Sequence, residues 1–87
     1  MDLQSKLTAL MELAERLGID VRRVPLGGEG GGICTLQGRE VLFLDSSADL
    51  ATQWARSLAG LAQLPEIDKV YVIPELREEI DAVRGEG

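Results

Sequence analysis

The sequence has no histidine, one cysteine and very few aromatic residues, which make up 3% of its 87 residues. The absence of histidine removes the side chain that most often transfers protons or binds metals near neutral pH. A single cysteine cannot form a disulfide within the chain, as is usual in a reducing cytoplasm. Carboxylates remain as potential metal ligands, but they do not follow the spacing of a calcium-binding loop. We therefore expect a cytoplasmic protein with no cofactor and no metal site.

Positive charge is also scarce, because 9 basic residues stand against 15 acidic ones and give a formal net charge of −6. The largest basic cluster is the pair Arg22–Arg23, which is too small to hold a phosphate backbone. Apolar runs are far shorter than the roughly 18 residues of a membrane span. The first residues carry acids where a signal peptide carries bases. We expect neither nucleic acid nor a membrane as a partner.

What the sequence does have is enough aliphatic surface for a core, since 45% of its residues are hydrophobic. Leu, Val, Ile and Ala must supply most of that core because aromatic residues are rare. A chain of this length predicts a single small domain over residues 1–87, with residues 85–87 frayed.

Helical spacing of apolar residues predicts three helices. The first covers residues 3–17, with Asp2 at its start and Gly18 at its end. The second begins at Ser46 or Ser47, with Asp49 in capping-box spacing from Ser46. The third begins at Pro74 and buries Leu76, Ile80 and Val83. The buried face expected for the second helix consists of Leu50, Trp54, Leu58, Leu61 and Ala62.

Four segments have strand character. Residues 19–24 alternate between apolar and polar side chains, and the following Pro25 indicates an edge strand. Residues 33–37 and 40–45 flank Gly38–Arg39, which predicts a β-hairpin. Residues 41–44 and 69–73 are apolar on both faces, which is typical of central strands.

The resulting order is α-β-β-β-α-β-α, which predicts an α+β fold with two layers. We expect a four-stranded mixed sheet with helices mainly on one face. The strand at residues 40–45 would reach the strand at residues 69–73 through one helix, in a right-handed crossover.

The segment 26–38, LGGEGGGICTLQG, contains six of the ten glycines. It does not match a phosphate loop, because Ile33 stands where the last glycine of GxGxxG is required and a strand follows instead of a helix. The favoured interpretation is a flexible connection between antiparallel strands. A ligand-gating loop that uses Gly31 and Gly32 is the alternative.

Cys34 lies in the predicted strand after this loop and shares a face with Leu36. We expect it to behave as a small buried hydrophobic residue. The alternative is a reactive or redox-sensing thiol, although such a thiol needs a lowered pKa and only an arginine could supply it. Arg22, Arg23 and Arg39 are the candidates for that role.

Two further sets of charged residues have both a functional and a structural interpretation. Arg22, Arg23 and Arg77 could bind a small anion near the glycine-rich segment. In the structural interpretation, Arg22–Arg23 would prevent an edge strand from pairing with a strand of another molecule. Arg77 would form an ion pair with Asp81 one helical turn away. Asp45 follows an apolar strand, and we expect an exposed acid that leads into the second helix.

Three stretches, LGIDVRRV, GGICTLQGREVLFLD and YVIPELREEID, resemble a family of small uncharacterised bacterial proteins. That resemblance covers residues 17–81, and it marks Gly31, Gly32, Cys34, Pro74 and Arg77 without implying an activity. The chain is also similar, more weakly, to the core of zinc metallopeptidases of the ImmA/IrrE type. The helix that carries HExxH in those enzymes corresponds here to ATQWARSLAGL, which has no histidine, so the resemblance implies neither zinc nor peptidase activity.

The sequence favours a non-catalytic protein-interaction or regulatory module. Its partner would be another protein or a second copy of the chain, as in a homodimer. A thiol-dependent enzyme or redox sensor based on Cys34 is one alternative. A small-anion-binding domain based on Arg22, Arg23 or Arg77 is the other.

Overall fold

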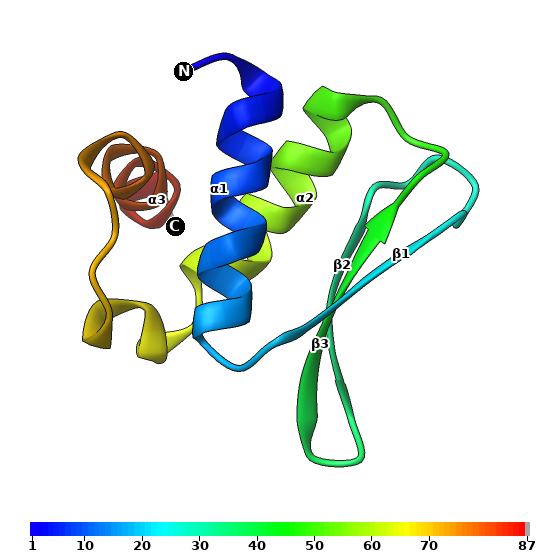
Figure 1. Cartoon of the computed structure of the whole chain (residues 1–87), viewed down its shortest axis with the longest axis horizontal. Helices are drawn as coiled ribbons and strands as arrows, with labels where there is room; N and C mark the ends of the chain where they lie inside the picture. The colour runs from blue at the N-terminus through cyan, green and yellow to red at the C-terminus, as the bar shows by residue number, and fades with distance from the viewer. Residues whose placement is uncertain (87) are drawn as a thin grey trace.

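The computed structural model describes residues 1–86, which form three α-helices, one 3-10 helix and a three-stranded mixed sheet. The helices all lie to one side of the sheet, with α1 and α2 next to it and α3 farthest away (Figure 1). The α+β class is confirmed, whereas the expectation of four strands is wrong. Within residues 1–86, no helix has both the length and the apolar character that crossing a membrane requires.

Helix α1 (Leu3–Arg16) begins and ends as its sequence predicts. A carboxylate oxygen of Asp2 accepts the backbone N–H of Ser5 at 2.7 Å, which satisfies one of the free donors of the first turn. Gly18, just beyond the helix, has φ +82°, a conformation that glycine adopts without strain.

Helix α2 (Leu50–Ala62) starts later than expected, because its cap is Asp49 and not a serine. The Asp49 carboxylate accepts the N–H of Thr52 at 2.7 Å. Ser46 and Ser47 are held by the end of the sheet instead, where the N–H of Ser46 donates to the carbonyl of Val24. The α2 residues that are buried are Ser57, Leu58, Leu61 and Ala62, whereas Trp54 is half-buried and Leu50 is exposed.

Helix α3 (Pro74–Glu86) begins at the predicted proline. Leu76 and Ile80 are buried, and Val83 packs against the core from its margin. The helix includes two of the three residues for which we expected fraying, and Gly87 lies outside the described residues.

The sheet contains β1 (Asp20–Val24), β2 (Gly31–Leu36) and β3 (Arg39–Asp45) in the order β1-β3-β2. Strand β3 is central and β1 is at an edge, as predicted. Strand β2 pairs antiparallel with β3 in a hairpin as predicted, but its two-residue turn is Gln37–Gly38, one residue earlier than the predicted Gly38–Arg39. Strand β1 pairs parallel with β3. The parallel neighbour of β3 is therefore β1, and not the segment at residues 69–73.

The fourth strand is replaced by a 3-10 helix, η1 (Pro65–Lys69), and an extended segment at residues 70–73. Both edges of β3 are already occupied by β1 and β2. The segment packs against the core instead, with Val72 buried, Val70 and Ile73 partly buried and Tyr71 exposed. The side chain of Val72 is 7% exposed, and the Arg16 guanidinium donates to the carbonyl of Tyr71 at 3.1 Å. A side chain of α1 thus supplies the hydrogen bond that a neighbouring strand would have supplied.

The buried apolar residues other than Val41 form one cluster between the sheet and the helices. Alternation along β3 divides its side chains between the two faces of the sheet. Leu42 and Leu44 point to the helices and are almost fully buried, and Ile33 of β2 joins them. Val41 and Phe43 point to the opposite face, over which Figure 1 shows no helix of the described chain.

Candidate functional site

The glycine-rich connection between β1 and β2 surrounds the carboxylate of Asp45, the last residue of β3. One carboxylate oxygen accepts the N–H groups of Leu26 and Ser47, both at 2.8 Å. The other accepts those of Gly28 at 2.7 Å and Gly30 at 3.1 Å. Asp45 has 0% exposed surface, so the expectation of an exposed helix-leading acid is wrong.

The four donors also determine the ionisation of Asp45. Burial by itself disfavours the charged carboxylate and raises its pKa. The four backbone N–H groups, three from the loop and one from Ser47, outweigh that effect and lower the pKa of Asp45 from 3.8 to about 2. The loop therefore binds an anion, as converging backbone amides do, but that anion is the protein's own side chain. This internal occupant leaves these four amides unable to bind a phosphate or carboxylate from solution.

Gly31 and Gly32, the two candidate ligand-binding glycines, differ in their surroundings. Gly31 has φ +91°, and a Cβ atom there would lie 2.0 Å from the carbonyl oxygen of Phe43. Its lack of a side chain is therefore a requirement of the close approach between β2 and β3. A Cβ atom at Gly32 would meet open space. Gly32 lies opposite Phe43 on the uncovered face of the sheet.

A groove of about 500 Å³ lies beside these glycines. Its lining comes from β2, from Phe43 of β3, from the glycine-rich loop and from α2. Arg56 of α2, which the sequence analysis did not single out, borders this groove and donates to the carbonyl of Glu29 at 2.9 Å. The residues that line the groove are Leu26, Glu29, Gly31, Gly32, Ile33, Cys34, Phe43 and Arg56.

Cys34 borders the same groove and is exposed, so the expectation that it is buried is wrong. The alternation itself is as predicted, because Cys34 and Leu36 do share a face of β2. That face is the uncovered one, and Leu36 is itself 43% exposed. The sequence pattern indicated the shared face but not which side the helices would cover.

The three candidate arginines do not come together. Arg22 of β1 pairs with Asp20 at 2.9 Å, and Arg23 is exposed on the same strand. Arg77 lies on α3, on the far side of the helical layer from the sheet (Figure 1). Its guanidinium donates to Asp68 and to the carbonyl of Ile67, each at 3.2 Å. The expected pairing of Arg77 with the Asp81 carboxylate is present at 3.8 Å.

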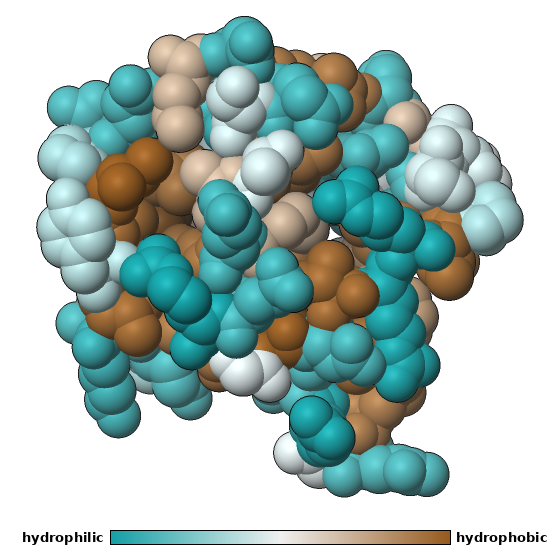
Figure 2. All heavy atoms as spheres, in the orientation of Figure 1, coloured by the Kyte–Doolittle hydropathy of each residue, from teal (hydrophilic) through white to brown (hydrophobic). Residues whose placement is uncertain are grey.

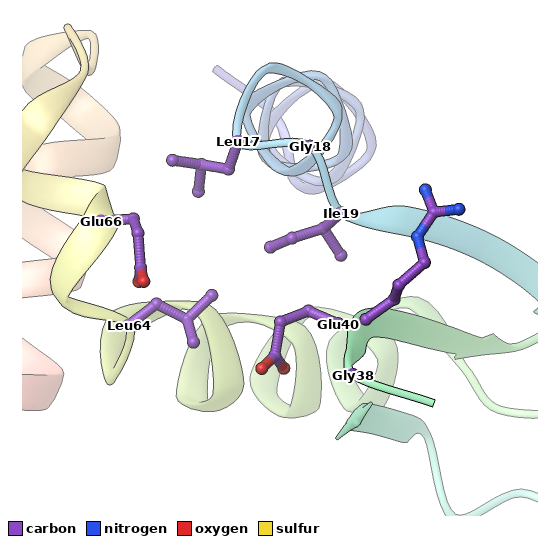
Figure 3. A pocket seen from close by; sticks show the side chains of 8 residues that line it. Leu17, Gly18, Ile19, Gly38, Glu40, Leu64 and Glu66 are labelled. Atoms are coloured by element: carbon purple, nitrogen blue, oxygen red, sulfur yellow. The ribbon is translucent and has the colours of Figure 1, made fainter. Parts of the chain in front are cut away.

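A smaller cleft of about 260 Å³ lies between the hairpin, the end of α1 and η1. Its apolar lining comes from Leu17, Ile19 and Leu64, and two carboxylates border it (Figure 3). Glu66 reaches into the cleft from η1, whereas Glu40 comes from β3. Within residues 1–86, no three side chains that could bind a metal lie together. Arg39 also lines this cleft, so its charged lining consists of two carboxylates and one guanidinium, and it offers no cluster of positive charge for an anion.

No protein-family model matches this sequence, no curated protein matches it significantly, and no solved structure does. The class of the protein therefore rests on its own architecture, an α+β fold with a three-stranded mixed sheet covered on one face. The resemblances drawn from its motifs stay predictions.

Proposed function

We propose that this protein is an interaction module that binds another polypeptide through the uncovered face of its sheet and the adjoining edge of β2. The observation that carries this proposal is the one-sided placement of the helices (Figure 1). It leaves an apolar strip on the opposite face, where a second layer of protein normally packs against a sheet. The exposed or partly exposed side chains of that strip are Cys34, Leu36 and Phe43, with Leu26 beside them, whereas Val41 of the same face is only 2% exposed.

The charge distribution supports the same face as the contact surface. Residues 20–45 carry three arginines and four acids, and one of those acids is the buried Asp45. Residues 20–45 therefore carry only −1 of the net charge of −6, and most of it lies outside the sheet region. Interfaces characteristically have few charges at their centre and polar groups at their rim, and Arg22 and Arg39 would lie at such a rim.

Selection from a random peptide library displayed on phage tests this proposal. We expect selected peptides to change the amide NMR resonances of β2 and of Phe43, because both border the groove. Substitution of Phe43 by serine should weaken binding at least tenfold, a loss of about 1.4 kcal/mol that is typical of an aromatic anchor. The matched control is Tyr71→Ser, which removes an aromatic side chain that is 69% exposed beside α1 and α3 and does not line the groove. Resonance changes confined to the helices would contradict the proposal.

A thiol-dependent function is a second candidate, and the exposure of Cys34 favours it. An accessible thiol can react with an oxidant or an electrophile if a neighbouring cation stabilises its thiolate form. Arg56, which borders the same groove, is the candidate cation. The labelling rate of Cys34 by iodoacetamide, compared with that of free cysteine at pH 7, tests this function. A rate equal to that of free cysteine, and unchanged in Arg56→Gln, would contradict it.

A further inference from the structure

The two edges of the sheet differ in their protection against pairing with another strand. Strand β1 carries Asp20, Arg22 and Arg23 and is followed by Pro25, and charges and proline are typical devices that block an edge. Strand β2, with the sequence GGICTL, has neither a charge nor a proline. Its last three residues, Cys34, Thr35 and Leu36, are all exposed. An unprotected edge of this kind is a template for a further strand.

The hydrogen-bond pattern of the hairpin shows which groups of β2 are available for a further strand. The N–H of Asp45 donates to the carbonyl of Gly30, so residue 30 and alternate residues after it bond to β3. Cys34 therefore bonds inward, whereas the N–H and C=O groups of Ile33 and Thr35 point outward. No backbone partner of these outward groups is present in the part of the chain that the structure describes.

The uncovered face also has an exposed apolar side chain and a groove with an apolar lining that could accept one. The exposed side chain is Leu36, a large apolar side chain that is 43% exposed near the hairpin tip. The groove lies beside Gly32, which is paired with Phe43. Because Gly32 has no side chain, Phe43 can be reached from the free edge of β2. Leu36, Gly32 and Phe43 all belong to the same face of the sheet.

We propose that two copies of this chain pair through β2, antiparallel and around a twofold axis at Cys34, to form one six-stranded sheet. In this register Ile33 of each copy exchanges two hydrogen bonds with Thr35 of the other. Leu36 of each copy then lies opposite Gly32 of the other and fills the groove beside its Phe43. The inference rests on the proposed function and names its partner as a second copy.

The two halves of this interface are identical, as a closed dimer requires. Because β2 is uncharged, two chains with a net charge of −6 can approach there without bringing like charges into contact. A single pair of short strands and one leucine on each side bury less than the roughly 1,200 Å² of a standard interface. The dimer is therefore weak and forms in a concentration-dependent manner.

The position of Cys34 on the axis gives a direct test of the register. Opposite residues in a non-hydrogen-bonded antiparallel pair have Cα atoms about 4.5 Å apart, which is within disulfide range. A shift of the axis to Ile33 would place the two cysteines diagonally, at about 7–8 Å, where a disulfide does not form without backbone movement. The experiment oxidises the folded protein with diamide, which accepts the two electrons and two protons that a pair of thiols releases.

We expect Cys34 to form a covalent dimer at least about tenfold faster than a cysteine that meets its counterpart only by collision. The collision control is Thr8→Cys combined with Cys34→Ser, which places the only thiol on the exposed surface of α1. Equal rates for the two proteins would overturn the proposal. Light scattering across a concentration series should show the corresponding reversible dimer in reducing buffer.

Two substitutions at one position separate pairing from folding. Thr35→Pro removes an N–H that points away from β3, so the hairpin keeps its own hydrogen bonds while the new ones are lost. Thr35→Ala keeps that N–H and serves as the matched control. We expect Thr35→Pro to abolish both the dimer and the rapid cross-link, with an unchanged circular dichroism spectrum, and Thr35→Ala to retain both. A dimer that persists in folded Thr35→Pro would overturn the proposal.

The dimer experiments and the peptide selection together distinguish failure of the dimer proposal from failure of the proposed function. A monomeric chain whose groove still binds selected peptides would overturn only the identity of the partner. A monomeric chain whose peptides bind elsewhere would overturn the proposed function as well. If Thr35→Pro does not fold, Leu36→Asp provides the same test, because it places a charge against Phe43 of the partner copy without touching the backbone.

Discussion

Asp45 joins three parts of the molecule at a single carboxylate. Asp45 is the last residue of β3. Its carboxylate accepts N–H groups from the loop after β1 and from Ser47, which lies in the connection to α2. The glycines of this loop are needed because a backbone that turns several N–H groups toward one point requires left-handed conformations. Gly28 and Gly30, with φ +94° and +95°, are two of these.

Replacing Asp45 by asparagine keeps the size of the side chain but removes its charge and replaces one accepting oxygen with a donor. Two of the loop N–H groups then face an NH₂ group, and buried donors left without an acceptor are destabilising. We expect a melting temperature lower by about 10 °C or more for a domain of this size. Thermal unfolding followed by circular dichroism measures the change. Asp49→Asn is the matched control, because an asparagine can also cap a helix.

The ionisation of Asp45 predicts how stability depends on pH. Its pKa is about 2 in the folded protein, below the ordinary value of 3.8, so the folded state favours the charged form. The stability that this gives is fully present above about pH 4 and is lost as the pH falls toward 2. Urea unfolding at pH 5, 4, 3 and 2.5 measures this loss. The loss should be smaller in Asp45→Asn, and an equal loss in both proteins would contradict the assignment.

Ser57 is a buried polar residue of α2 whose hydroxyl has no hydrogen-bond partner among residues 1–86. Burying such a group costs free energy that an apolar residue of similar size does not incur. We expect Ser57→Ala to raise the free energy of unfolding by about 1 kcal/mol, because alanine also favours a helix. Urea denaturation measures this gain. A loss of stability would show that the hydroxyl has a partner, such as a buried water.

At the scale of elements, the hairpin between β2 and β3 has one residue that does not suit its conformation. Its two-residue loop has φ +52° at Gln37 and φ +80° at Gly38, as in the type I′ turns that favour Asn-Gly. We expect Gln37→Asn to raise the free energy of unfolding by about 0.5 kcal/mol, because asparagine tolerates this conformation better than glutamine. Gly38→Ala, which places a Cβ atom at positive φ, should lower it by about 1 kcal/mol. Urea denaturation of both variants checks the two signs.

Elements that depend on local chemistry were predictable from the sequence. Asp2 caps α1, Pro74 begins α3 and the hairpin turn lies within one residue of its predicted position. Each of these signals acts within a few residues. The segment at residues 70–73 was predicted wrongly as a strand. The prediction paired this segment with β3, and the pattern of apolar residues does not reveal that β1 and β2 already flank β3 on both sides.

The candidate site was less predictable than the fold for the same reason. The glycine-rich loop was recognised as a connection, but the carboxylate that it surrounds lies at least 15 residues farther along the chain. Arg56 lies on the exposed side of α2 and contacts a carbonyl 27 residues earlier, which no local pattern indicates. The exposure of Cys34 depends on which face of the sheet the helices cover. All three features arise from tertiary contacts.

At the scale of the whole molecule, the layers are held together by one continuous core. Figure 2 shows apolar residues exposed between hydrophilic ones in this view, over the helical layer as well as beside the sheet. Helix α3 packs on α2 and α2 packs on the sheet, so the two ends of the molecule are connected through α2. A small domain with a single core of this kind unfolds in one cooperative step.

Ile80 tests that cooperativity, because it is fully buried on α3, the helix farthest from the sheet. Ile80→Ala should lower the free energy of unfolding by about 2–5 kcal/mol through lost burial and the cavity left behind. The only tryptophan, Trp54 on α2, lies beside Lys6 of α1, with 5.6 Å between the amine and the ring centre. Urea unfolding followed by Trp54 fluorescence and by circular dichroism should give coincident transitions in the native chain and in the variant. If α3 instead unfolds independently, the circular dichroism of the variant will change at a urea concentration that leaves Trp54 fluorescence unaffected.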